Sequence, residues 1–101
     1  MGWREDLDRF RGLVEKEYSP EKIILFGSRA RGDEFTDSDV DLLIVSEKFE
    51  NMSFRERMIK MQFLWEGDEL LEALCYTPDE FEKKKRQFGI VKKGVEEGIA
   101  I

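Results

Sequence analysis

The chain has no histidine, a single cysteine and only two prolines among its 101 residues. The missing histidine excludes imidazole general bases and imidazole metal ligands. The lone Cys75 cannot form a disulfide within the chain and lies in an apolar run, so we expect a small buried side chain in a reducing cytoplasm. Apolar runs are short, and none is long enough to cross a bilayer. We therefore expect a cytoplasmic protein without a membrane span or signal peptide.

The chain also has fewer basic than acidic residues. The chain has 17 Lys and Arg residues against 23 Asp and Glu residues, which gives a formal net charge of -6. Non-specific binding to a nucleic-acid backbone needs a basic surface, so we expect no strong binding of that kind. Hydrophobic residues make up 41% of the chain, which is enough for one core at this length. We predict a single domain over residues 1–101.

The most informative stretch begins with an apolar run over residues 23–26, which predicts a strand that ends at Gly27 and Ser28. A glycine lets the backbone approach a ligand closely, and a helical turn that starts at Ser28 would aim backbone N–H groups at an anion. Arg29 and Arg31 follow. Each would either approach phosphate oxygens or form ion pairs that brace the loop. The stretch therefore predicts a phosphate-binding turn.

A second strand is expected over residues 38–46, and it carries two acids. Asp39 and Asp41 are two residues apart, so their side chains leave the same face of the strand. The apolar residues Val40, Leu42 and Ile44 leave the other face. Two carboxylates this close raise one another's pKa unless a cation lies between them. Hard oxygen ligands on a rigid strand suit Mg²⁺, which takes the rest of its shell from water and substrate phosphates.

A third strand is expected over residues 69–76, with one acid among apolar residues. Alternation puts Glu72 on one face with Leu70, Leu74 and Tyr76. Burying an unpaired carboxylate costs free energy, so we expect Glu72 to have a binding partner or to be exposed. If the third strand lies beside the second, Glu72 faces Asp39 and Asp41 and completes a group of metal ligands. If it does not, Glu72 is a simple acid at a strand edge.

Helices are expected around these strands. Apolar residues at spacings of three and four predict an amphipathic helix over residues 3–17. Ser53 is a plausible N-cap for a helix that runs to about Trp65. Thr77, followed by Pro78, predicts the start of a final helix. Its apolar positions are Phe81, Phe88, Val91 and Val95, and it is weakened by Gly89, Gly94 and Gly98.

Three features of these helices have two readings each. The helix after Ser53 has more apolar residues than one stripe needs, which predicts either a broad core face or a surface for a partner or a nucleobase. The basic run at residues 83–86 is either a solvated helix face or a contact for RNA or an acidic partner. Residues 98–101 are apolar and expected to be loosely structured, packing on the sheet or docking onto another chain.

The order of these motifs carries a resemblance. Gly27-Ser28-Arg29-Ala30-Arg31-Gly32 followed by Ser38-Asp39-Val40-Asp41-Leu42 resembles the minimal nucleotidyltransferases of the DNA polymerase beta superfamily. The resemblance implies an α+β fold, with a small mixed β-sheet of about three strands and helices packed mainly on one face, like the polymerase beta palm. In the family the third metal-site carboxylate is usually Asp. Glu72 is one methylene longer, and this would shift or weaken a second metal.

The family resemblance also implies an activity and its residues. Asp39, Asp41 and Glu72 would be the catalytic, metal-binding residues of a two-Mg²⁺ site. Gly27, Ser28, Arg29 and Arg31 would bind a nucleoside triphosphate, ATP in the first instance. The reaction would transfer a nucleoside monophosphate to an acceptor hydroxyl, and it needs no histidine because the metal lowers the pKa of the hydroxyl.

The resemblance further implies a partner. Free-standing minimal members of the family are paired with small helical HEPN-type toxins, so the chain would be an antitoxin that transfers AMP to a tyrosine of its toxin. The assembly would be a homo- or hetero-oligomer. The alternative is a catalytically silent module with the same fold, which neutralises its partner by contact through the apolar helix face and the apolar C-terminus. A phosphate-independent divalent-cation protein is disfavoured, because the loop lacks the ligand pattern of an EF-hand.

Overall fold

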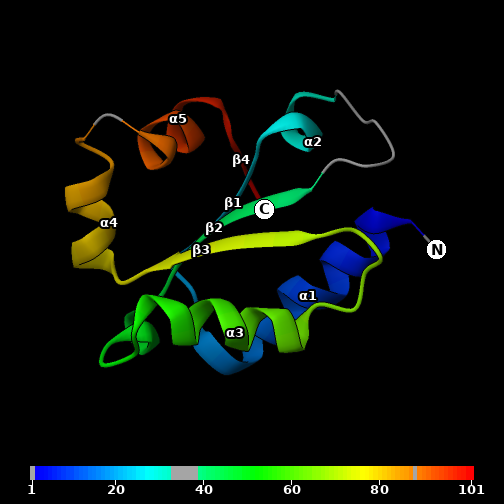
Figure 1. Cartoon of the computed structure of the whole chain (residues 1–101), viewed down its shortest axis with the longest axis horizontal. Coiled ribbons are helices and arrows are strands. Elements are labelled where there is room, and N and C mark those ends of the chain that lie inside the picture. Colours follow the sequence, from blue (N-terminus) through cyan, green and yellow to red (C-terminus); the bar gives the residue numbers. More distant parts are fainter. Residues whose placement is uncertain (1, 33–38, 88) are drawn as a thin grey trace.

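A computed structural model describes residues 2–32, 39–87 and 89–101, and so Ser38 and Phe88 lie outside it (Figure 1). The elements in chain order are α1 (Trp3–Tyr18), β1 (Lys22–Phe26), α2 (Ser28–Arg31), β2 (Val40–Val45), the 3-10 turn η1 (Glu47–Phe49), α3 (Phe54–Leu64), β3 (Leu71–Tyr76), α4 (Pro78–Lys84), α5 (Ile90–Glu97) and β4 (Ile99–Ala100). They form the small α+β fold with a mixed sheet that the sequence predicts. No helix in the described part of the chain is long and apolar enough to cross a membrane.

The sheet has four strands in the order β3-β2-β1-β4. β1 pairs with β2 antiparallel, with Phe26 opposite Asp41, and β2 pairs with β3 parallel, with Asp41 opposite Glu72. The end of β1 therefore meets the starts of β2 and β3 at one end of the sheet. The fourth strand corrects the expectation of a loose C-terminus. β4 pairs antiparallel with β1, with Ile99 opposite Leu25, because the apolar end gains backbone partners there.

Each face of the sheet has its own helices. Side chains of Val40, Leu42 and Ile44 share one buried cluster with Leu7, Phe10 and Val14 of α1 and Met61 of α3. On the other face, Leu43 and Val45 of β2 form a cluster with Phe81 of α4 and Val91 of α5. In Figure 1 the two longer helices, α1 and α3, lie below the sheet and α5 lies above it. The alternation of β2, read from the sequence, is confirmed.

The secondary structure differs most clearly from the prediction in the final helix. A single helix was expected from Thr77 past Val95, but α4 and α5 are separate helices. α5 begins after Gly89, whose φ of 141° is a backbone conformation that favours glycine. Val95 is 41% exposed, so it is not a core position. A Cβ on Gly94 would lie 2.8 Å from Cδ1 of Leu43, so the absence of a side chain lets α5 approach the sheet.

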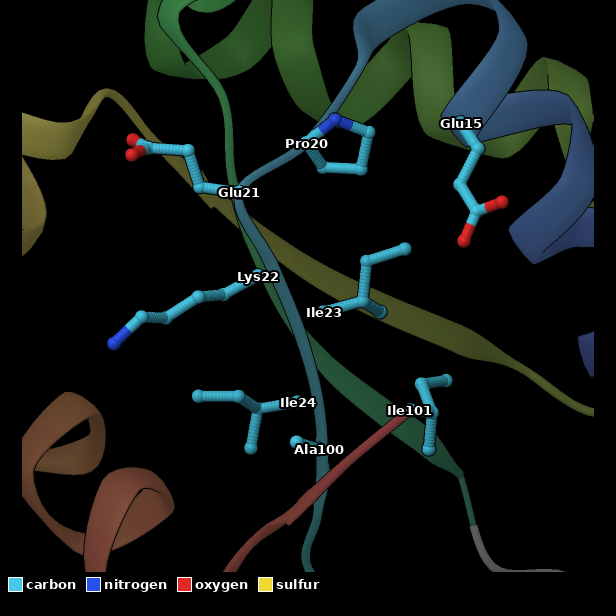
Figure 2. A pocket seen from close by; sticks show the side chains of 8 residues that line it. All are labelled: Glu15, Pro20, Glu21, Lys22, Ile23, Ile24, Ala100 and Ile101. Atoms are coloured by element: carbon cyan, nitrogen blue, oxygen red, sulfur yellow. The ribbon is translucent and has the colours of Figure 1, made fainter.

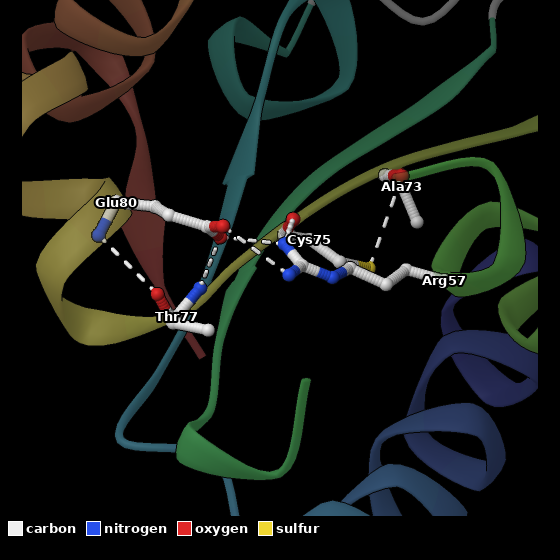
Figure 3. A network of polar contacts seen from close by, with 5 residues as sticks. All are labelled: Arg57, Ala73, Cys75, Thr77 and Glu80. Atoms are coloured by element: carbon white, nitrogen blue, oxygen red, sulfur yellow. Dashed lines mark hydrogen bonds and ion pairs between the residues drawn. The ribbon is translucent and has the colours of Figure 1, made fainter. Parts of the chain in front are cut away.

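A buried arginine links α3 to the end of β3 and to the start of α4 (Figure 3). Arg57 of α3 is 4% exposed, and its guanidinium donates hydrogen bonds to both carboxylate oxygens of Glu80 at 2.5 and 3.2 Å. It also donates to the carbonyl oxygen of Cys75 at 3.1 Å. Glu80 in turn accepts from the backbone N–H of Thr77 in a capping box that starts α4. The hydrogen bond from Arg57 is the main reason that the pKa of Glu80 lies below its usual value.

The solvent side of α3 carries apolar residues among charged ones such as Arg55, Glu56 and Lys60. Within α3, whose residues are all described, only Arg57 and Met61 are buried. Phe54, Met58 and Ile59 are exposed, and Phe63 is 82% exposed. A broad core face is therefore wrong for Met58, Ile59 and Phe63, which are exposed. The ring of Phe54, by contrast, lies 5.6 Å from the ring of Tyr76 in β3, centre to centre. The other reading, a surface for a partner, stays a prediction.

Candidate active site

Three carboxylates from two neighbouring strands meet at one end of the sheet. Asp39 directly precedes β2, Asp41 lies within β2, and Glu72 lies opposite Asp41 in β3. One carboxylate oxygen from each residue lies within 4.8 Å of the other two. Asp39 and Asp41 are half-buried and Glu72 is exposed, so the group opens to solvent. The structure therefore brings together the three acids that the sequence predicts would face one another.

The negative charges of Asp39 and Glu72 repel that of Asp41. The pKa of Asp41 is raised from 3.8 to about 6, first by burial and then by the charge of Glu72, a hydrogen bond with Glu72 and the charge of Asp39. A cation between the acids would relieve this repulsion. The ligand set consists of oxygens alone, which is the set that Mg²⁺ prefers. The residues present therefore fit a divalent metal such as Mg²⁺.

Gly27 brings the backbone of the preceding turn against this acid group. Its φ of 77° is a conformation that favours glycine. A Cβ at this position would lie 2.3 Å from Oδ2 of Asp41, so a side chain would overlap the carboxylate. Phe26, just before it, is the partner of Asp41 in the sheet. The glycine turn and the acids therefore share one small space, which is the arrangement that the motifs predict for a site that binds a metal-bound phosphate.

The two arginines of α2 have different surroundings. Arg31 is exposed and lies close enough to Asp41 for its charge to lower the pKa of that carboxyl, against the larger effects that raise it. Arg29 is buried, and its guanidinium carbon lies 4.8 Å from the centre of the Trp3 ring. In the sequence, Trp3 is one of the apolar residues whose spacing predicts the helix over residues 3–17. No spacing signal in the sequence links it to Arg29, because the contact arises from tertiary packing.

A separate hollow lies away from the acid group (Figure 2). Its volume is about 360 Å³, and it lies at the start of β1, the opposite end of that strand from Gly27. It is lined by Glu15, Pro20, Glu21, Lys22, Ile23, Ile24, Ala100 and Ile101. Figure 2 shows Glu21 and Lys22 pointing to one side of β1 and Glu15 lying on the other. Its charged groups do not converge, so the acid group is the better candidate for chemistry.

The fold and the acid group together define a class of protein. A mixed sheet with two acids at the start of its central strand and a glycine turn beside them is the arrangement that the sequence motifs predict for a nucleotidyltransferase. A family model described as a nucleotidyltransferase domain matches residues 7–101. The chain belongs to this family.

Two curated relatives come from the archaeon Methanocaldococcus jannaschii, and both are named "putative protein adenylyltransferase". The first is 28% identical over 96 residues, which cover 95% of this chain and 90% of the relative. The second is 34% identical over 58 residues, which cover 55% of this chain and 59% of the relative. The first match extends over nearly the whole of both proteins, so the likeness is not confined to the glycine and acid motifs.

Two solved structures share the fold. A crystal structure titled as a "putative nucleotidyltransferase" from Sulfolobus solfataricus has a TM-score of 0.66 and 22% identity, and the match covers 95% of this chain and 76% of that one. BolA1 from Arabidopsis thaliana has a TM-score of 0.60 and 22% identity, and the match covers 74% of this chain and 94% of that one. At this identity the likenesses show the fold alone, and one fold can serve different functions.

Proposed function

We propose that this protein transfers AMP from ATP to a hydroxyl group of another protein. The observation that carries the proposal is the convergence of Asp39, Asp41 and Glu72 beside the backbone of Gly27. A metal-bound triphosphate needs acids for the metal and close backbone for the phosphates, and here both lie in one space. The names of the two archaeal relatives add the choice of AMP and of a protein acceptor.

Each residue has a role in this proposal. Asp39, Asp41 and Glu72 would hold Mg²⁺, which supplies charge neutralisation on the phosphates and lowers the pKa of the acceptor hydroxyl. Gly27 and Ser28 would receive the β- and γ-phosphates through backbone N–H groups and the serine hydroxyl. Arg31 would approach a phosphate oxygen from the exposed side of α2. Arg29, the fourth residue predicted to bind phosphate, is buried against Trp3, and its role would be to hold α2 in place.

The proposed reaction is an in-line displacement at phosphorus. The acceptor oxygen forms a bond to the α-phosphorus of ATP, and the bond from that phosphorus to the oxygen bridging to the β-phosphate breaks. Pyrophosphate leaves with that bonding pair, and the hydroxyl proton passes to solvent. The protein contributes orientation and charge rather than a strong base. This is consistent with a chain that contains no histidine.

The proposed acceptor is a tyrosine of a HEPN-type toxin, for which the chain would serve as antitoxin. This part rests on the resemblance to free-standing minimal nucleotidyltransferases. The exposed apolar residues Phe54, Met58, Ile59 and Phe63 of α3 supply a surface suited to a protein partner. Leu70, two residues before Glu72, is a further exposed apolar residue at 74%.

The test is to incubate the protein with labelled ATP, Mg²⁺ and the product of the neighbouring gene, and to measure the mass of both proteins. The proposal expects the partner to gain the mass of one AMP group on a tyrosine. The matched control is the Asp39→Asn, Asp41→Asn double variant, which keeps the shape of the site but removes two charges. A mass gain on the partner that is equal in the control would contradict the assigned roles.

A second candidate function is a silent module that neutralises its partner by contact. The observation that favours it is the group of exposed apolar residues on α3, with Phe63 at 82% exposure. Co-elution with the partner by wild type and the double variant alike, with no mass change and no ATP binding by either, would support this candidate over the enzyme. A Phe63→Glu variant that no longer co-elutes would then identify the contact surface.

A further inference from the structure

Arg29 is the one residue of α2 that is buried, and it lies over an aromatic ring of a distant helix. Its guanidinium carbon is 4.8 Å from the centre of the Trp3 ring. Trp3 is the first residue of α1 and packs, partly buried, against the main core. A guanidinium over an indole face is held by the electrons of the ring, and more strongly so when water is excluded. The contact therefore ties α2 to the start of α1.

α2 depends on such contacts for its shape. It has only four residues, Ser28–Arg31, and a helix this short cannot repay its own nucleation cost. Its orientation must come from tertiary packing. At one end Gly27 lies against Asp41, and along its length Arg29 and Ala30 pack inward. Ser28 and Arg31 belong to the same turn as Arg29, so a rotation that released Arg29 would move both of them relative to the acids.

We propose that Trp3 is a positioning residue for the nucleotide site. Through Arg29 it holds the turn of α2 in the orientation in which Gly27, Ser28 and Arg31 receive the triphosphate. This inference rests on the proposed function and adds to it a residue of α1 that lies outside the glycine and acid motifs. Trp3 itself touches neither metal nor phosphate in this account.

Two variants of Trp3 distinguish the effect of an aromatic ring from the effect of apolar volume. Trp3→Phe keeps a ring under the guanidinium, whereas Trp3→Leu keeps an apolar side chain without one. We expect Trp3→Leu to weaken binding of ATP with Mg²⁺ about fivefold, and Trp3→Phe to stay within about twofold of wild type. Because Trp3 acts through Arg29, the Trp3→Leu, Arg29→Met double variant should bind no more weakly than Arg29→Met alone. Calorimetry measures all four affinities.

A second readout uses the free protein. We expect the amides of Ala30 and Arg31, which donate to the carbonyl oxygen of Gly27, to exchange hydrogen faster in Trp3→Leu than in wild type or Trp3→Phe, with the exchange of β2 and β3 unchanged. Unchanged exchange at these two amides would overturn the inference. So would faster exchange with unaltered ATP affinity, since the contact would then be structural only.

A wild-type protein that binds no ATP would defeat the proposed function, and the positioning role would fail with it. That result differs from failure of the inference alone, in which wild type binds ATP and Trp3→Leu binds it equally well. The two failures are therefore separated by the wild-type titration.

Discussion

Gly27 and Asp41 are the pair of residues on which the site depends most directly. The glycine has a backbone conformation that disfavours other residues, and its α-carbon faces the carboxylate with no room for a methyl group. The carboxylate in turn has a raised pKa because it is partly buried beside two other acids. Both features cost stability in the isolated protein. Such costs are common where a site is shaped for a ligand rather than for the fold.

A Gly27→Ala variant tests the close approach. The positive φ alone should cost about 1 kcal/mol of unfolding free energy, and the overlap with Oδ2 of Asp41 should add about 1 kcal/mol or more. Gly32→Ala gives the cost of a left-handed glycine position with open space, because Gly32 has φ 79° and ψ 8° and nothing lies within 4 Å of an added Cβ. Gly27 has ψ -158°, a region open almost only to glycine, so its larger loss combines backbone strain with the overlap. Urea unfolding should show a larger loss for Gly27→Ala. Equal losses would mean that the carboxylate does not lie against the turn.

An Asp41→Asn variant tests the repulsion within the acid group. The folded pKa of about 6 lies above the ordinary 3.8, so the folded protein binds this proton more tightly than the unfolded chain does. Stability therefore falls as pH rises from about 4 to about 6 and stays lower above that. Removing the charge should raise the unfolding free energy by about 1 kcal/mol at pH 7 in EDTA, a figure reduced for the partial exposure of the group.

The gain from Asp41→Asn should shrink as pH falls below about 6 and be mostly gone near pH 4, where the carboxyl is protonated in the folded protein and about half protonated in the unfolded chain. Asp8→Asn, on the exposed side of α1, is the control and should bring no such gain. Thermal unfolding across pH 4 to 8 measures both. A wild-type protein that is as stable as Asp41→Asn at pH 7 would show that the three acids do not repel one another as described.

At the scale of elements, buried polar links decide how α3 and α4 join the sheet. Arg57 is buried in α3, and its charge is balanced by Glu80 at the start of α4. Losing the acid would leave a buried cation without its partner, which costs more than the pair contributes. The link also caps α4 through Thr77. These contacts attach α4 to the end of β3 independently of the apolar core.

A Glu80→Gln variant isolates the charge, because the amide oxygen can still accept from Thr77. We expect a loss of about 1–2 kcal/mol in unfolding free energy at pH 7. Since the folded pKa of Glu80 is lowered, its contribution should be present above the unfolded value near 4.5 and be lost as pH falls below it. Glu82→Gln, which removes an exposed pair with Lys85, is the control and should change nothing measurable. Equal effects of the two would refute the link.

Local signals in the sequence predicted most elements well. Strand alternation assigned the two faces of β2, and the caps at Ser53 and Thr77 marked the starts of α3 and α4. The break before α5 was missed because Gly89, Gly94 and Gly98 each weaken a helix, and nothing in the local sequence marks which of them lies at a boundary. The burial of Arg57 was missed for a different reason. Its partner Glu80 comes from another segment, and no local pattern couples the two.

At the scale of the whole molecule, the candidate site could be predicted in outline. The sequence predicted that Asp39, Asp41 and Glu72 would converge if the second and third strands were neighbours, and the parallel pairing of β2 with β3 brings them together. The surroundings of Arg29 could not be predicted, because they depend on how the start of α1 packs beside α2. The fourth strand, β4, could not be predicted either, because two residues are too few to show a periodic pattern.

The net charge of -6 bears on what the whole molecule can bind. An acidic protein repels bare ATP and gains affinity for it only where a divalent cation offsets the charge. The acid group at the end of the sheet is the place where such a cation would be held. Metal dependence of ATP binding is therefore the central expectation of this account.

The most direct measurement is calorimetric titration of ATP into the protein with Mg²⁺ and again with EDTA, for wild type and for the Asp39→Asn, Asp41→Asn double variant. We predict saturable binding by wild type with Mg²⁺, at least tenfold weaker binding in EDTA, and no metal-dependent binding by the double variant. Equal binding by the two proteins, or none by wild type at millimolar ATP and Mg²⁺, would contradict the claim that these acids and the Gly27 turn form one nucleotide site.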